Sequence, residues 1–135
     1  MKQQEKQILL KDLCARLPYG INLYVEEPKK LPDNEHISVG FIGGYALDKE
    51  QCQDFSISEI LESLDNGSIV KPYLRPISSM TEEEKKEYKK LQHCFNDTML
   101  TISLLNNWLN EHHFDYNGLI EKGLAFEAPE GMYKN

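Results

Sequence analysis

Apolar positions repeat with two different periods along this chain. Near the start, Leu10, Leu13 and Leu17 recur at the spacing of one helical face, which predicts a helix over residues 9–17. The same spacing places Asp12 and Arg16 toward water. From residue 21 onward apolar and polar side chains alternate, which is typical of strands that bury one face. The expected strands are 21–25, 36–42 and 52–55.

The helical period returns after residue 80. Thr81 and Glu84 have the spacing of a capping box, in which each side chain binds the other residue's backbone N–H group, and they predict a helix over 82–95. The apolar stripe of residues 99–109 predicts a second helix over 98–112, with Trp108 as a buried structural anchor. A shorter helix over 117–122 should end at Gly123, a residue suited to a left-handed cap.

These periods predict an α+β fold. We expect an N-terminal helix, a small antiparallel sheet of three or four strands and a C-terminal helical part of two or three helices. A chain of 135 residues has the usual size of one domain, so we expect a single domain over 1–135. Its strand-rich part should cover about 18–78 and its helical part about 79–135.

Two segments between these parts are harder to interpret. Ser56 and Glu59 fit a capping box at the start of a helix over 56–64, but residues 65–67, Asp-Asn-Gly, equally suit a hairpin turn between two short strands. Residues 71–76 contain Pro72 and Pro76, and each proline disfavours helix in the residue before it. We interpret 71–76 as an extended connector.

Composition narrows the classes of protein. The formal net charge is −7, which is unfavourable for binding duplex nucleic acid or an anionic membrane surface. The longest apolar runs are only a few residues, too short for a membrane-spanning helix, and the first residues do not resemble a signal peptide. Cys14, Cys52 and Cys94 are isolated, as expected of reduced thiols in a cytoplasmic protein.

Potential proton-transfer or metal-binding side chains gather in one place, at His112, His113 and Asp115. With Glu111 they suggest a small metal-assisted or hydrolytic enzyme. Adjacent histidines on a helix point in different directions, however, and a metal site needs further ligands at suitable spacing. A histidine in the last helical turn also stabilises the helix dipole. We therefore favour a structural role and expect no catalytic residue, metal or cofactor.

Aromatic residues and an arginine in extended or loop segments are common anchors of protein interfaces. We single out five residues as candidates for binding a partner. They are Tyr73, Arg75, His113, Asp115 and Tyr116.

Three stretches carry a resemblance to a known family. They are DLCARLPYG (12–20), KPYLRPISSMTEEEKKEYKKL (71–91) and WLNEHHFDYNGLIEKGLAFEAPEGMY (108–133). Together they resemble a family of small uncharacterised proteins of gut bacteria and of their prophages or other mobile elements. The resemblance covers roughly half of the chain and implies an intracellular accessory protein of phage origin. It carries no activity, cofactor or catalytic residue to this sequence.

The leading expectation is a non-catalytic protein-interaction module that binds an unknown protein partner and no membrane. The first alternative is the enzyme that uses the histidine cluster. A weaker alternative is nucleic-acid binding through Lys85, Lys86, Lys89 and Lys90 together with Tyr73 and Arg75, although the neighbouring glutamates would repel phosphate.

Overall fold

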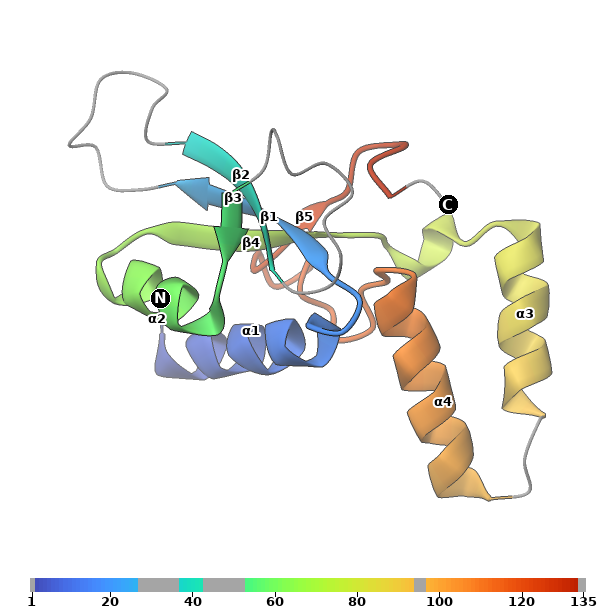
Figure 1. Ribbon diagram of the computed structural model, residues 1–135. Helices are drawn as coiled ribbons and strands as arrows, with labels where there is room; N and C mark the ends of the chain where they lie inside the picture. Colours follow the sequence, from blue (N-terminus) through green and yellow to red (C-terminus); the bar gives the residue numbers. More distant parts are fainter. Residues whose placement is uncertain (1, 27–36, 43–52, 94–96, 134–135) are drawn as a thin grey trace.

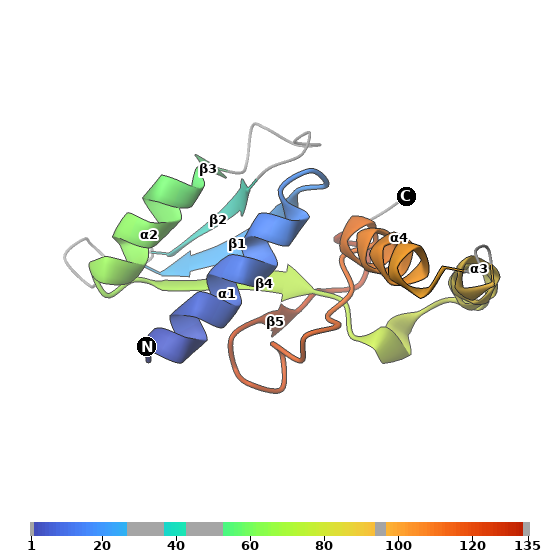
Figure 2. The same ribbon diagram turned by 90° about the horizontal axis from the view of Figure 1, so that it is seen from below.

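The computed structural model describes residues 2–26, 37–42, 53–93 and 97–133. Helices α1 (Gln3–Arg16) and α2 (Ile57–Asp65) lie side by side on one face of a sheet (Figures 1 and 2). Helices α3 (Glu82–Gln92) and α4 (Thr98–Glu111) form a hairpin that projects from this body. The predicted α+β class is confirmed. Within the described residues, no helix has both the length and the apolar character needed to cross a membrane.

The sheet has five strands in the order β3-β2-β1-β4-β5. The three central strands are antiparallel to one another, as expected: β1 (Ile21–Glu26) pairs with β2 (Ile37–Ile42) on one side and with β4 (Ile69–Leu74) on the other. The outer strands β3 (Gln53–Phe55) and β5 (Phe126–Glu127) pair in parallel with β2 and β4. The prediction of an antiparallel sheet of three or four strands is therefore wrong for the two edge strands, which are parallel to their neighbours and bring the number of strands to five.

The connections allow the parallel edges but do not dictate them, because residues 27–36 join the antiparallel strands β1 and β2 over the same length as residues 43–52. Antiparallel neighbours need a turn of only about two to five residues, whereas parallel neighbours need a long crossover. Residues 43–52 separate β2 from β3, which is longer than a tight turn, and β5 follows the whole hairpin. Two parts of the prediction fall outside the described residues. One is residues 45–47, in the expected strand-rich part. The other is residues 94–96, at the expected end of the helix over 82–95.

The main core lies between the sheet and helices α1 and α2. Alternate residues of β1 are buried, as the period of two predicts. Leu9 and Leu13 of α1 and Ile60 of α2 are fully buried against them. The buried apolar residues of this core are Leu9, Leu13, Ile21, Leu23, Val25, Ile60, Val70, Leu74, Leu119, Leu124 and Ala125.

Two polar residues of α1 also enter the core. Arg16 and Asp12 are buried rather than directed toward water, so that expectation was wrong. The Arg16 Nε donates to Asp12 Oδ2 at 2.8 Å, and Arg16 Nη2 donates to the carbonyl oxygen of Phe114 at 2.8 Å. Pairing and hydrogen bonding offset the cost of burying these charges. The arginine thereby ties α1 to the segment that follows α4.

The two ambiguous segments are resolved. Residues 57–65 are helical, and Ser56 and Glu59 make both hydrogen bonds of the capping box. Residues 69–74 are not a connector but a strand inside the sheet, although Pro72 lacks an N–H donor. Pro72 faces Leu23 at the last registered pair of β1 and β4, so the strands separate just beyond it.

The hairpin encloses a second, smaller cluster. Trp108, Leu109 and Phe114 are buried in it, and Tyr88 and Leu91 of α3 pack against them. Trp108 is buried, as predicted, and Thr81 and Glu84 make the predicted capping box. The first turns of α4 differ from the prediction. Met99 and Ile102 belong to the expected apolar stripe but are exposed, because α3 covers only the base of α4.

The predicted helix over 117–122 is a single turn rather than a helix. The N–H groups of Leu119 and Ile120 donate to the Asp115 carboxylate at 2.9 and 3.0 Å, which begins the turn. Gly123, with φ of 76°, ends it in the left-handed conformation expected at a cap. The chain then reverses to form β5, so no further turn is added.

Candidate functional site

A cleft of about 630 Å³ lies where the hairpin joins the sheet. Its floor begins at Arg75, directly after β4, and continues through the short 3-10 helix η1 (Ile77–Ser79). One wall is the start of α3, and the opposite wall is the C-terminal segment 127–133. His112, the C-cap residue of α4, closes the base.

Arg75 is held rigidly in this cleft by Glu84. Its guanidinium group makes two hydrogen bonds with the Glu84 carboxylate, at 2.8 and 2.7 Å. The same group lies 4.2 Å from the centre of the Phe114 ring, a cation–π contact. Such a two-pronged pair fixes the orientation of both side chains. Most of the positive charge of Arg75 is thus neutralised within the molecule.

Glu84 has three roles at once. Its carboxylate accepts from the Thr81 backbone N–H at 2.9 Å, binds Arg75, and lies 3.4 Å from His112 Nδ1. The hydrogen bonds from Arg75, joined by those from Thr81, lower the pKa of Glu84 to about 2 against the opposing effect of burial. Glu84, which belongs to the capping box of α3, therefore also joins the hairpin to the residue that follows β4.

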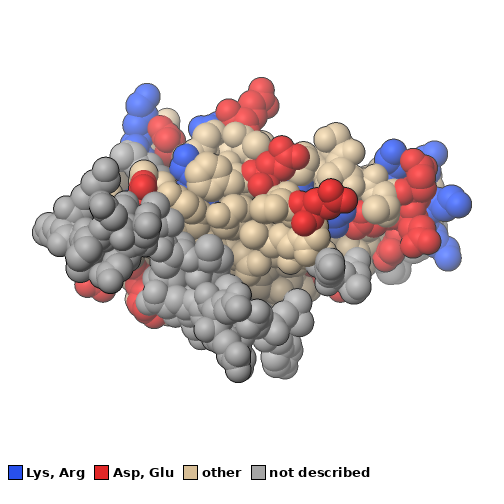
Figure 3. Space-filling view, turned by 90° about the horizontal axis from the view of Figure 1, so that it is seen from above, with Lys and Arg blue, Asp and Glu red and all other residues tan. Residues whose placement is uncertain are grey.

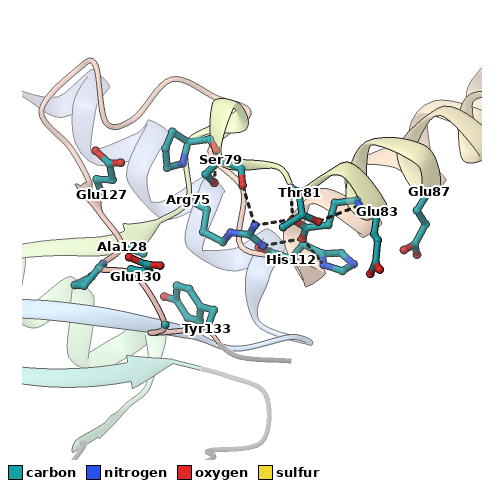
Figure 4. A pocket seen from close by; sticks show the side chains of 14 residues that line it. Arg75, Ser79, Thr81, Glu83, Glu87, His112, Glu127, Ala128, Glu130 and Tyr133 are labelled. Carbon is teal, nitrogen blue, oxygen red and sulfur yellow. Dashed lines mark hydrogen bonds and ion pairs between the residues drawn. The ribbon is translucent and has the colours of Figure 1, made fainter.

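The remaining charge in the cleft is acidic. Figure 3 shows acidic side chains across the middle of one face of the molecule, with fewer basic ones among them. Figure 4 shows Glu83 and Glu87 on the α3 side and Glu127 and Glu130 on the C-terminal side, with Arg75 between them. All four glutamates are exposed, and no lysine is among the described residues that line the cleft. A cationic group is the complementary ligand.

The C-terminal wall is fixed by Tyr133. Its hydroxyl group accepts from the Asn22 N–H at 3.0 Å and donates to the Tyr73 carbonyl oxygen at 2.7 Å. In the register of β1 and β4, Asn22 and Tyr73 are the next pair after Leu23 and Pro72. The hydroxyl group therefore bridges the two strands where they separate. Burial raises the pKa of this phenol well above its usual value, so it stays protonated and able to donate.

His113 supports the same wall from behind. Its ring stacks on the Tyr133 ring at a centroid distance of 3.9 Å. Burial, assisted by the charge of Arg16, lowers the pKa of His113 to about 4, so the imidazole is neutral at pH 7. Its backbone has φ of 65°, and the Phe114 N–H donates to the Leu109 carbonyl oxygen at 2.9 Å. These are the features of a left-handed cap at the end of α4.

The structure separates the five residues that the sequence suggested for binding. Only Arg75 lines the cleft. Tyr73 lies on the sheet face opposite α1 and α2, with its ring centroid 6.0 Å from that of Phe126. His113 lies behind the C-terminal wall, stacked on Tyr133. Asp115 binds backbone N–H groups of the next turn. Tyr116 lies beside α1, where its hydroxyl group donates to Asn110 Oδ1 at 2.9 Å.

The suggested histidine cluster is also separated. His112 faces Glu84, and its ring centroid lies 4.3 Å from that of Trp108. His113 instead stacks on Tyr133. Over the described part of the chain, no group of three or more His, Cys, Asp or Glu residues is arranged to hold a metal ion. The hydroxyl groups of the cleft are engaged as well: Ser79 Oγ donates to the Pro76 carbonyl oxygen at 2.7 Å, and Thr81 Oγ1 accepts from the Glu84 N–H.

Sequence reasoning did not select the four exposed glutamates. The five candidate binding residues include none of Glu83, Glu87, Glu127 and Glu130. A local signal exists in the acidic first turn of α3 and in the segment Glu-Ala-Pro-Glu at 127–130. Neither stretch indicates that the two lie on opposite walls of one cleft, because their proximity depends on β5 pairing with β4.

Comparisons with known proteins add no relative. No protein-family model matches the chain, and neither the curated proteins nor the solved structures contain a significant match.

Proposed function

We propose that this protein is a non-catalytic interaction module whose acidic cleft binds a basic segment of a partner protein. One observation carries the proposal. Four exposed glutamates lie on two facing walls of the cleft, and Arg75 is already paired with Glu84. The described residues that line the cleft include no other arginine and no lysine. A lysine or arginine side chain entering the cleft meets carboxylates from both sides.

Rigidity also favours binding over catalysis. Arg75, Glu84 and Tyr133 are each fixed by two or more contacts, so the walls are in place before a partner arrives. A preformed site loses less conformational entropy on binding. The hydroxyl groups of Ser79 and Thr81 are hydrogen-bonded within their own turns, which makes them poor nucleophiles. The acidic walls also repel phosphate, which disfavours nucleic acid as the ligand.

The resemblance noted in the sequence agrees with an accessory role, and we extend it to the proposal that the module is of phage origin. The partner is then identified by its chemistry, as an exposed lysine- or arginine-rich stretch.

A labelled peptide of alternating arginine and alanine tests the proposal by fluorescence anisotropy. The parent should bind it, and Glu127→Gln with Glu130→Gln should weaken binding about tenfold, because each exposed ion pair contributes up to about 1 kcal/mol. The matched control is Glu62→Gln with Glu121→Gln, which removes the same charge from exposed positions elsewhere. Equal losses in both variants, or no binding by the parent, would refute the proposal.

A further inference from the structure

The distal half of the α3–α4 hairpin has the character of a docking surface. Helix α4 begins with large apolar side chains in water: Met99 is 75% exposed and Leu100 is 56% exposed. The hairpin projects from the body, so no other described element covers this end (Figure 1). The last turn of α3, at the same end, carries Lys89 and Lys90. The carboxylate of Asp97, also at this end, is engaged as the cap of α4. Among the described residues this end is thus apolar and on balance basic, which is the chemistry that the cleft is proposed to bind.

The charged side chains along one side of α3 are complementary to those of a second α3 helix that runs antiparallel to it. Glu83, Lys86, Glu87 and Lys90 recur at i, i+3, i+4 and i+7, so they lie along one side of the helix. Glu83 stands nearest the cleft and Lys90 nearest the distal end, with Lys86 and Glu87 between them. At the α3 end of the molecule, at the right of Figure 3, acidic and basic side chains lie close together. When two such helices run antiparallel, Glu83 of each faces Lys90 of the other, and Glu87 faces Lys86.

Apolar residues follow the same arrangement. Leu100 and Leu104 precede Trp108 by about two turns and one turn of α4. The Trp108 indole N–H donates to Glu87 at 3.0 Å, which places this side of α4 next to the cleft side of α3. Near the cleft, Ile77 of η1 is 43% exposed. In the antiparallel arrangement the distal end of one hairpin lies over the cleft of the other, so Leu100 approaches Ile77.

We propose that the occupant of the cleft is a second copy of this chain. The last turn of α3 and the first turn of α4 in each copy enter the cleft of the other copy, about a two-fold axis that crosses the middle of α3. This inference rests on the proposed function, since it names the source of the basic segment. A two-fold contact uses both ends of each hairpin and therefore closes as a dimer. The short contact and the net charge of −7 predict a dissociation constant of about micromolar or weaker.

Sedimentation of the full chain over a range of concentrations tests the dimer. Glu83→Lys and Lys90→Glu should each weaken association about 100-fold or more, because each change creates two like-charge contacts per dimer. An equimolar mixture of the two variants should associate again, since every facing pair is then of opposite charge. Lys89→Glu is the matched control, because residue 89 lies roughly 100° around the helix from residue 90.

A second pair of variants tests the apolar contact. Leu100→Asp should weaken the dimer, whereas Ile102→Asp should do so much less, because the two positions are roughly 200° apart on α4. A parent that stays monomeric, or a mixture of the charge-reversed variants that fails to associate, would overturn the inference. If that monomer still binds the arginine peptide through Glu127 and Glu130, the proposed function stands alone. If the dimer forms, the peptide should dissociate it, and a dimer indifferent to the peptide would contradict occupation of the cleft.

Discussion

The body and the hairpin are stabilised in different ways. In the described part of the chain, the core between the sheet and α1 and α2 contains eleven buried apolar residues, whereas the hairpin cluster contains three. Specific contacts at the base of the hairpin compensate for its smaller core. The main ones are the ion pair of Arg75 with Glu84 and the stacking of Trp108 on Phe114, whose ring centroids are 5.8 Å apart. Stability in the body is spread over many side chains, and stability in the hairpin depends on a few.

This difference makes the base of the hairpin the most sensitive part of the molecule. Trp108→Ala should lower the free energy of unfolding by about 3–5 kcal/mol, because a large buried ring and its hydrogen bond to Glu87 are lost. Hydrogen exchange should show loss of protection in α3 and α4 while β1 and β4 stay protected. Leu100→Ala is the control and should change stability by less than about 0.5 kcal/mol. Equal loss of protection in β1 would show that the two regions unfold as one unit.

Removal of the ion pair should have the next largest effect. Glu84→Gln leaves Arg75 partly buried without a carboxylate and should cost about 3 kcal/mol near pH 7. The pKa of Glu84 is lowered in the folded protein, so its contribution is present above its ordinary pKa of 4.5 and is lost as the pH falls toward 2. Urea unfolding of parent and variant between pH 7 and pH 2 should therefore converge at the acidic end. If the free energies of unfolding of parent and variant differ by the same amount from pH 7 to pH 2, the ionised Glu84 carboxylate is not the cause of the difference.

His113 should give a smaller effect in a different pH window. Its folded pKa of about 4 lies below its ordinary 6.5, so the unfolded chain takes up a proton first and stability is lost as the pH falls from 6.5 to 4. His113→Asn should flatten this loss, because asparagine does not titrate and tolerates positive φ. His113→Ala should be less stable than the asparagine variant by about 1 kcal/mol, because alanine lacks the polar side chain whose local hydrogen bonds help asparagine to adopt the left-handed conformation. Identical pH profiles for parent and asparagine variant would remove His113 as the titrating group.

The smallest expected change is at the cleft wall. Glu127→Gln with Glu130→Gln should alter the free energy of unfolding by less than about 0.5 kcal/mol, since both side chains are exposed. Thermal unfolding of this double variant beside the parent checks that any loss of peptide binding comes from charge. A marked fall in melting temperature would instead assign these glutamates to the stability of the C-terminal segment.

Local patterns in the sequence predicted most of the elements. The alternation at 21–25 and both capping boxes depend on neighbouring residues alone, and the structure confirms them. The errors involve residues whose roles are set by distant partners. Asp12 and Arg16 look solvent-exposed by helical spacing, but Phe114 and Asn117 supply hydrogen-bond partners that make their burial favourable. The stripe at Met99 and Ile102 looks buried, but α3 does not reach it.

The candidate site was less predictable than the fold for the same reason. Arg75 was selected from its residue type and lies in the cleft, but its pairing with Glu84 depends on how β4 leads into η1 and α3. The glutamates of the two walls are about 40 residues apart in the sequence, and a search for spaced motifs does not connect such positions. The parallel pairing of β5 with β4 and the hydrogen bonds of Tyr133 bring them together.

The hydroxyl bridge of Tyr133 has a consequence for synthesis of the chain. It joins Asn22 of β1 to Tyr73 of β4, yet Tyr133 follows Tyr73 by 60 residues and is therefore made well after both strands. Residues 119, 124 and 125 of the main core are made late as well. While a nascent chain grows, β1 and β4 can pair, but the end of the sheet beyond Pro72 stays open. Closure must then wait until residue 133 has left the ribosome, so a product that stalls before this residue leaves the edge available to other chains.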